Sequence, residues 1–359
     1  MAEYRGIGYL RKKLNVKRGR VNTRYRYYEM KNAMRDFGIS TPPELRSFNS
    51  VLGWCGKAVD SLADRLVFRE FQNDDFDMNE IFRMNNPDVL FDSAVLSAMI
   101  SSCCFVYISK GENGFPQLQV IDGGNATGII NPITGLLQEG YAVLERDDNR
   151  NPVLEAYFTA EETVYYRKGE SYIDIEGNPT PAPLLVPIIH RPDAKRAFGH
   201  SRISRACMSI VGSALRTVKR SEISAEFYSF PQRYVLGMSD DVEQMDKWKA
   251  SMSSFLDIGR DEDGNVPQLG QFTQQSMSPH TEQLRMFAAL FAAETGLTLD
   301  TRALITDALA LEASAQLSLA PYLHWDEASV RRSLERLNQQ LGESHLETFR
   351  CHTKWCMRL

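Results

Sequence analysis

The sequence lacks several features that would place the protein in familiar classes. No apolar run approaches the roughly 20 residues that cross a bilayer, and the N-terminal MAEYRGIGYLRKK has no apolar signal segment. The phosphate-binding motif of P-loop ATPases is also missing, because Gly123 and Gly124 are followed by no Lys-Ser/Thr pair. We therefore expect a cytosolic protein that is not an ATP-hydrolysing motor, and we interpret Gly123 and Gly124 as a turn.

Cysteine is scarce and shows no paired spacing of the kind that binds zinc. The 6 cysteines are Cys55, Cys103, Cys104, Cys207, Cys351 and Cys356. We expect reduced, buried thiols, since disulfides are rare in the cytosol. Cys351, His352 and Cys356 lack a partner cluster, and Asp74, Asp75 and Asp77 do not follow the spacing of an EF-hand. The sequence thus predicts no metal site and no cofactor.

The chain carries a formal net charge of −5 and has one strongly basic segment at its start. Its basic residues include Arg11, Lys12, Lys13, Lys17, Arg18 and Arg20, with Tyr25, Tyr27 and Tyr28 following. Two interpretations stay open. The segment is either an arm that meets nucleic acid or an acidic partner, or a solvated lead-in whose tyrosines dock onto a neighbour. The chain as a whole is not a general polyanion binder, because a protein that grips nucleic acid normally presents a basic face to the phosphates.

The next part of the chain has helical and then alternating periodicity. Apolar residues at three- and four-residue steps predict helices over 48–68 and 87–102. From Cys104 the pattern alternates, with turn signals such as DGGN, NPITG and DDNRNP between short runs. These runs predict an antiparallel meander that ends in PLLVPIIH, so the fold class is α+β.

The chain is organised around a long helix predicted over 201–229. Its apolar stripe consists of Ile203, Cys207, Ile210, Val211, Ala214, Leu215 and Val218. Gly199 permits a tight backbone before the helix, Ser201 is the expected N-cap, and Pro231 ends the helical region. At about 1.5 Å per residue this helix would be about 40 Å long, which suggests a structural strut.

Three strings, taken in order, resemble the portal proteins of tailed bacteriophages of the long-tailed siphophage type. They are VPIIHRPDAKRAFGHSRISRA, SAEFYSFPQRYVLG and MFAALFAAETGLTLD, and the resemblance covers residues 4–300. After Asp300 the tail departs from the family. A disrupted reading frame and genuine divergence with a shortened upper domain are both open explanations.

The resemblance implies a non-enzymatic subunit of a ring, commonly of twelve copies, at one capsid vertex. Such a ring starts procapsid assembly with capsid or scaffolding protein, docks the terminase and passes double-stranded DNA, and it later holds head-to-tail connector proteins. The protein would be in the host cytoplasm during assembly and then in the virion, without a membrane partner. The apolar stripe of the long helix would face a neighbouring subunit. A tunnel loop over 269–278 would present Gln271, Thr273, Gln274 and Gln275 to the channel.

On this basis we divide the chain into six parts. They are a basic arm (1–46), a helical wing portion (47–103), a β-rich meander (104–190), the stem-type helix and its exit (191–237), a region with a helix at 242–256, the candidate tunnel loop and a following helix (238–300), and an atypical helical tail (301–359).

Two rival functions remain. One is a DNA-binding adaptor that uses the basic arm, and the other is a metal-dependent nuclease that uses Asp261 and Asp263.

Overall fold

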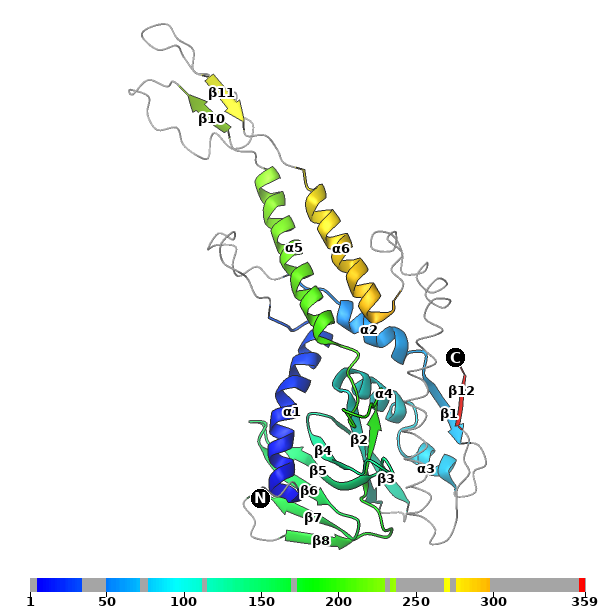
Figure 1. Cartoon of the computed structure of the whole chain (residues 1–359). Coiled ribbons are helices and arrows are strands. Elements are labelled where there is room, and N and C mark those ends of the chain that lie inside the picture. Colours follow the sequence, from blue (N-terminus) through cyan, green and yellow to red (C-terminus); the bar gives the residue numbers. More distant parts are fainter. Residues whose placement is uncertain are drawn as a thin grey trace. The chain divides into compact units, whose positions relative to one another are not determined.

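The computed structural model describes residues 5–33, 50–71, 77–111, 115–168, 173–229, 233–236, 268–271, 276–297 and 355–358. The chain divides into two compact units. The first unit consists of Met1–Ala33, Leu52–Val211 and Leu290–Leu359, and the second of Met34–Val51 and Gly212–Ala289. Figure 1 labels their helices and strands. No helix among the described residues is both long enough and apolar enough to span a membrane.

The first unit contains a three-stranded antiparallel sheet of order β3-β2-β9. Its strands are β2 (Cys103–Lys110), β3 (Pro116–Asp122) and β9 (Leu185–Ile189). The central strand β2 is buried over its first six residues, and all five residues of β9 are buried. Strands covered on both faces are apolar at consecutive positions rather than at alternate ones, which explains the continuous run LLVPII.

A second sheet in this unit is an antiparallel meander of five strands, in the order β4-β5-β6-β7-β8. Its strands are β4 (Ala126–Ile130), β5 (Leu137–Arg146), β6 (Pro152–Phe158), β7 (Glu162–Arg167) and β8 (Ile173–Gly177). The meander predicted from Cys104 is confirmed for the runs that form β5 to β8, and Gly123 and Gly124 lie in a turn as expected. The prediction is wrong for the runs at β2, β3 and PLLVPIIH, because these strands form a separate sheet in which β9 pairs with β2. Phe105, Phe158 and Leu185 belong to one buried core cluster formed by both sheets.

Three shorter helices and a strand lie in the same unit. They are α2 (Trp54–Ala63), β1 (Val67–Phe71), α3 (Met78–Met84) and α4 (Leu90–Ser101). The helix predicted over 87–102 is confirmed from Leu90 onward. The helix predicted over 48–68 is too long, because a turn at Asp64 and Arg65 leads into β1. Its apolar residue Phe68 packs instead on Phe82 and Phe91, with ring centroids 4.6 and 4.4 Å away. β1 pairs with β12 (Trp355–Arg358).

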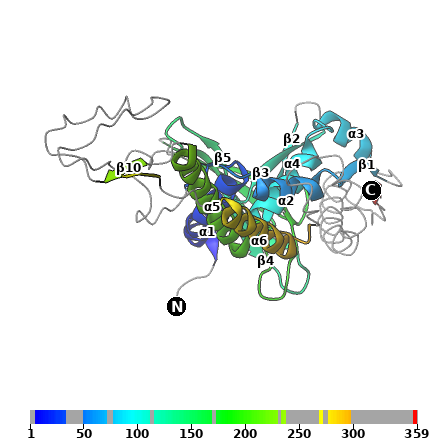
Figure 2. The same cartoon turned by 90° about the horizontal axis from the view of Figure 1, so that it is seen from above.

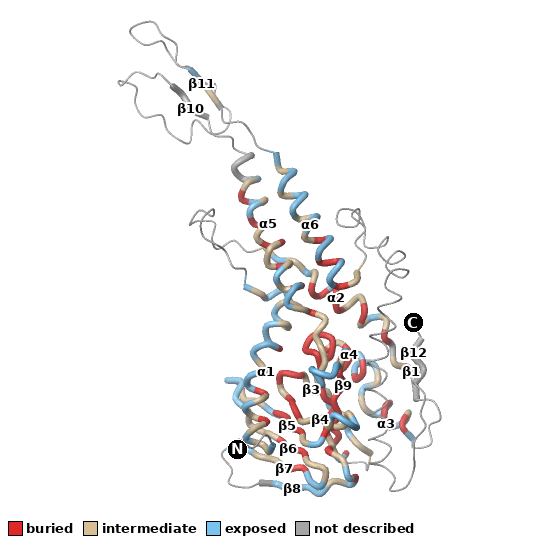
Figure 3. Tube along the Cα trace, in the orientation of Figure 1, coloured by how far each residue is buried: buried red, intermediate tan, exposed pale blue. Residues whose placement is uncertain are grey.

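The structure adds a helix that the sequence pattern does not predict, α1 (Gly6–Tyr28). Leu10, Leu14 and Val21 are its buried residues, and Leu10 and Leu14 join a core cluster with Tyr141 and Val143 of β5. Figure 3 shows that burial along α1 is confined to a few positions. The first part of the basic arm is therefore a helix packed on the five-stranded sheet.

The long predicted helix is α5 (Arg205–Ser229), which ends where expected but begins later than Ser201. Its N-cap is Ser204, because the Ser204 Oγ accepts a hydrogen bond from the Cys207 amide at 3.1 Å. Ser201 has another role and donates from Oγ to the Ile100 carbonyl at 2.6 Å. Gly199 has φ +67°, and a Cβ there would lie 2.0 Å from the His190 carbonyl oxygen. The turn before α5 therefore requires glycine.

The second unit holds residues 212–229 of α5, β10 (Arg233–Leu236), β11 (Gln268–Gln271) and the first part of α6 (Ser278–Thr295). β10 and β11 form an antiparallel ribbon in which Arg233 faces Gln271. Residues 269–271 of the expected tunnel loop form part of β11, so this part of the segment is a strand. Thr273, Gln274 and Gln275 lie outside the described residues, as does the helix predicted over 242–256.

Candidate functional site

The apolar stripe predicted along the long helix is largely covered by the chain itself. Ile203, Cys207 and Val211 are at most 2% exposed. Ala214 and Leu215 are buried as well, whereas Ile210 and Val218 are partly exposed. Most of the predicted subunit-packing residues therefore serve the core of their own chain, and only the last two present apolar surface.

Helix α6 carries an exposed apolar pair that the sequence reasoning missed. Met286 is 50% exposed and Leu290 is 49% exposed, and they lie four residues apart on one face. The opposite face of α6 buries Ala288, Phe291 and Ala292. The signal was present in MFAALFAAE, because a helix that is apolar on two sides has more apolar surface than one core contact needs.

Hydrogen bonds join α5 and α6 within each unit. In the first unit, the Ser204 Oγ donates to a Glu294 carboxylate oxygen at 2.7 Å. In the second unit, the Thr217 hydroxyl donates to the Gln283 side-chain oxygen at 2.9 Å. Thr217 is 2% exposed, so this bond satisfies a buried polar group. The two helices thus form a tied pair whose connection contains the β10-β11 ribbon.

The string HRPDAKRAFGHSRISRA forms a dense turn that fixes the start of α5. The Arg202 guanidinium donates to the Ala58 carbonyl at 2.7 Å and to the Thr295 carbonyl at 3.0 Å. A hydrogen bond from His200 is the main cause that lowers the pKa of the exposed Asp193 carboxyl. These residues tie one short segment to α2, α6 and itself.

The basic residues of α1 divide between the chain's interior and its surface. Arg11 pairs with Glu155, Lys13 donates to the Gly128 carbonyl at 2.7 Å, and Lys17 donates to the Cys103 sulfur at 3.0 Å. Burial lowers the pKa of Lys13. Lys12 and Arg20 are exposed, and Arg18 is half-buried.

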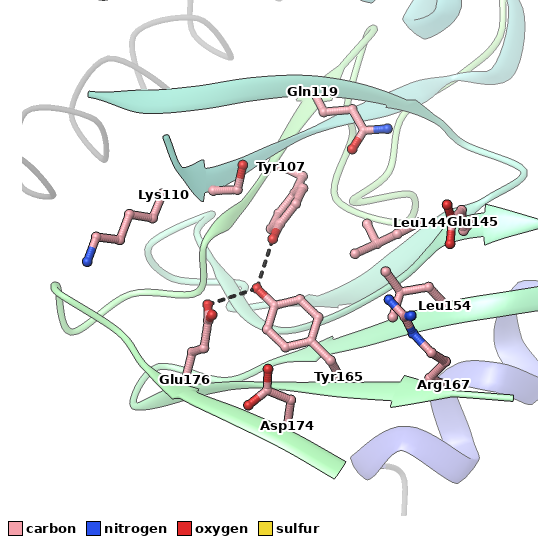
Figure 4. Close-up of a pocket in the computed structure, with 11 residues that line it drawn as sticks. Tyr107, Lys110, Gln119, Leu144, Glu145, Leu154, Tyr165, Arg167, Asp174 and Glu176 are labelled. Atoms are coloured by element: carbon pink, nitrogen blue, oxygen red, sulfur yellow. Dashed lines mark hydrogen bonds between the residues drawn. The ribbon is translucent and has the colours of Figure 1, made fainter. Parts of the chain in front are cut away.

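A cavity of about 680 Å³ opens between the two sheets of the first unit (Figure 4). The hydroxyls of Tyr107 and Tyr165 are 2.8 Å apart, and Tyr165 donates to Glu176 at 3.2 Å. Burial raises the pKa of both tyrosines, so their hydroxyls stay protonated near neutral pH. The lining carboxylates Glu145 and Asp174 have neither a histidine nor a cysteine beside them in this cavity.

The two carboxylates proposed for a nuclease are not among the residues that the structure describes. Asp261 and Asp263 lie outside the described residues, as do Asp74 and Asp75, whereas Asp77 directly precedes α3. Over the part of the chain that the structure describes, no group of three or more His, Cys, Asp or Glu residues could hold a metal ion.

The first unit contains two antiparallel sheets, and the second contains helical segments and a β-ribbon, so the chain has a mixed α+β fold. A family model described as phage portal protein, SPP1 Gp6-like, matches residues 7–313. The chain therefore belongs to this family of phage portal proteins. The resemblance given by the three sequence strings is confirmed, and the match continues past Asp300. The family is structural, in agreement with the expectation of a non-enzymatic role.

Curated relatives include the portal proteins of two mycobacteriophages. The portal protein of Mycobacterium phage D29 is 22% identical over 293 residues, and that of Mycobacterium phage L5 is 21% identical over 293 residues. Each match covers 76% of this chain and 60% of the relative. Among solved structures, a chain from the neck of an empty GTA particle with C6 symmetry has a TM-score of 0.47 at 15% identity. That likeness covers 91% of this chain and 87% of the other.

Proposed function

We propose that this chain is a ring-forming portal subunit that surrounds a channel for double-stranded DNA at one capsid vertex. The observation that supports it is the family match over 7–313, which includes both sheets and the α5-ribbon-α6 segment. The proposed partners are further copies of the chain, commonly twelve, the terminase, capsid or scaffolding protein and head-to-tail connectors. The subunit acts in the host cytoplasm during assembly and afterwards in the virion.

In this proposal the tied helices α5 and α6 form the stem of the subunit. Neighbouring copies pack against the apolar surface left exposed by the intramolecular core, namely Ile210, Val218, Met286 and Leu290. Leu290 is 49% exposed, so burying the rest of its side chain contributes about half of the 1.5–3 kcal/mol of a fully exposed leucine, once per interface. The interface is heterologous, since a rotationally symmetric ring joins two different faces of each subunit.

The channel lining is proposed near the end of the ribbon and the segment after it. Gln271, Thr273, Gln274 and Gln275 carry neutral side chains, which can touch moving phosphates without holding them through charge. ATP hydrolysis belongs to the docked motor and not to this subunit.

The test is negative-stain imaging of the purified chain, with Leu290→Asp as the interface variant. We expect closed rings from the wild-type chain and mostly monomers from Leu290→Asp. The matched control is Ile133→Asp, because Ile133 is 92% exposed and lies in a turn between β4 and β5. Magnesium-dependent cutting of DNA by a ringless chain would favour the nuclease. Salt-dependent DNA shifts by a ringless chain would favour the adaptor.

A further inference from the structure

Helix α1 leaves one face uncovered, and that face is basic. Its sequence has 23 residues with eight basic side chains (Arg11, Lys12, Lys13, Lys17, Arg18, Arg20, Arg24 and Arg26) and no acidic one. At 100° per residue, Lys12, Val16, Arg20 and Arg26 fall within about 120° of one another, opposite Leu10, Leu14 and Val21. All four of the first group are exposed. Lys12 and Arg26 lie about 21 Å apart along the axis, so we call this surface the α1 outer face.

The same unit has a strongly acidic segment. Residues 77–92 contain four acidic side chains (Asp77, Glu80, Asp88 and Asp92) and one basic side chain, Arg83. All four acidic residues are exposed. Burial, with the negative charges of Asp64 and Asp88, raises the pKa of the Asp92 carboxyl. The segment therefore has a net negative charge, because Arg83 is its only basic residue.

These two charged surfaces lie on opposite sides of the first unit. Figures 1 and 2, which are turned by 90°, both place α1 on one side of this unit and α3 on the other. One copy therefore presents a basic face in one direction and an acidic face in the other. This is the arrangement that a head-to-tail contact between identical subunits uses.

We propose that the α1 outer face of one copy docks against the acidic segment 77–92 of the next copy. This inference rests on the proposed ring. Opposite charges on the two faces steer association and fix which faces meet. A second copy suits the surface better than DNA, because Val16, 71% exposed, stands in the middle of the cations. Arg11, Lys13 and Lys17 are already bound inside the chain. Outside α1 the chain has 33 basic against 46 acidic residues, which would repel a polyanion.

Charge reversal tests this docking with two variants of the full chain. K12E/R20E makes the α1 outer face acidic, and D88K/D92K makes the acidic segment basic. Each variant alone opposes like charges, so we expect at least a tenfold loss of rings in native mass measurements. Mixed one to one, the variants present complementary faces again, and we expect alternating rings with even numbers of subunits. K195E/R205E is the matched control, since both residues are exposed and lie outside the two faces.

A photo-crosslinker at position 16 gives an independent readout that does not depend on ring closure. We expect it to capture peptides from residues 77–92 of a second copy, with a yield that falls as salt rises. The docking would be overturned if both charge-reversal variants still formed rings and the wild-type crosslinks lay elsewhere. The ring proposal would then still hold. A K12E/R20E variant that assembles normally but loses DNA binding in a gel shift would assign the face to DNA instead. A wild-type chain that stays monomeric without crosslinks would contradict both proposals.

Discussion

Helices α1 and α5 are similar in length, with 23 and 25 residues, but different forces hold them. Helix α5 has an amphipathic pattern and buries Cys207, Val211, Ala214 and Leu215 along one stripe. Helix α1 buries few apolar side chains, and its cations make an ion pair with Glu155, carbonyl contacts and aromatic contacts, such as Arg11 over the Tyr166 ring at 5.4 Å. A long helix can therefore be attached to a sheet by basic side chains, and its outer face is then free to keep the same charge.

The largest expected effect concerns the turn that starts α5. Gly199→Ala should lower the free energy of unfolding by about 3 kcal/mol or more, because its Cβ would meet the His190 carbonyl and its φ is left-handed. Chemical denaturation measures the change. Gly177→Ala is the control, since nothing lies within 4 Å of a Cβ there. Equal stability of the two variants would show that the turn does not fix the helix start.

The next effect tests the apolar attachment of α5. Leu215 is 1% exposed, so Leu215→Ala should cost about 2–5 kcal/mol through lost burial and the cavity left behind. Leu290→Ala should cost under about 1 kcal/mol in the isolated subunit, since Leu290 is 49% exposed. Thermal unfolding under conditions that keep both chains monomeric compares them. Similar losses at the two positions would contradict the assignment of one leucine to the core and the other to the surface.

A smaller effect concerns the N-cap. Ser204→Ala should destabilise the chain by about 1 kcal/mol, because the Cys207 amide loses its side-chain acceptor. Ser209→Ala, at an exposed position inside α5, should be neutral or slightly stabilising, since alanine has the higher helix propensity. Urea denaturation distinguishes the two, and a neutral Ser204→Ala would place the cap elsewhere.

The smallest expected effect tests the cationic attachment of α1. Arg11→Ala should cost about 1 kcal/mol, because the side chain pairs with Glu155 yet stays 42% exposed to screening solvent. Lys12→Ala, one residue away on the exposed face, should change stability by a few tenths of a kcal/mol. If urea denaturation gave the same change in unfolding free energy for both variants, the Arg11 cation would not help to attach α1 to the sheet.

The sequence predicts elements well where local periodicity matches burial. The stripe of α5, the helix at Leu90–Ser101 and the strands of the meander follow this rule. Helix α1 escapes detection because Leu10, Leu14 and Val21 are sparse among cations whose partners, such as Glu155 and Gly128, are distant in sequence. The pairing of β9 with β2 escapes for the same reason, since strand order depends on contacts between residues far apart.

The candidate site is predicted less completely. An apolar stripe marks a buried face but does not say whether its own chain or a neighbour covers it, and Ile203 and Leu215 turned out to be internal. Phe291 packs on Trp54 of α2, with ring centroids 5.6 Å apart, whereas Met286 and Leu290 stay half-exposed. Local sequence does not encode this tertiary contact. Family recognition succeeded because three strings, including the turn around Gly199, keep their order.

The native mass of the purified 359-residue chain tests the central claim most directly. Membership in the portal family predicts a closed oligomer whose mass is a whole-number multiple of 40.7 kDa, commonly twelve copies. Such a species, seen as rings by imaging, would establish the subunit as ring-forming. A monodisperse species of 40.7 kDa at all protein and salt concentrations would contradict it.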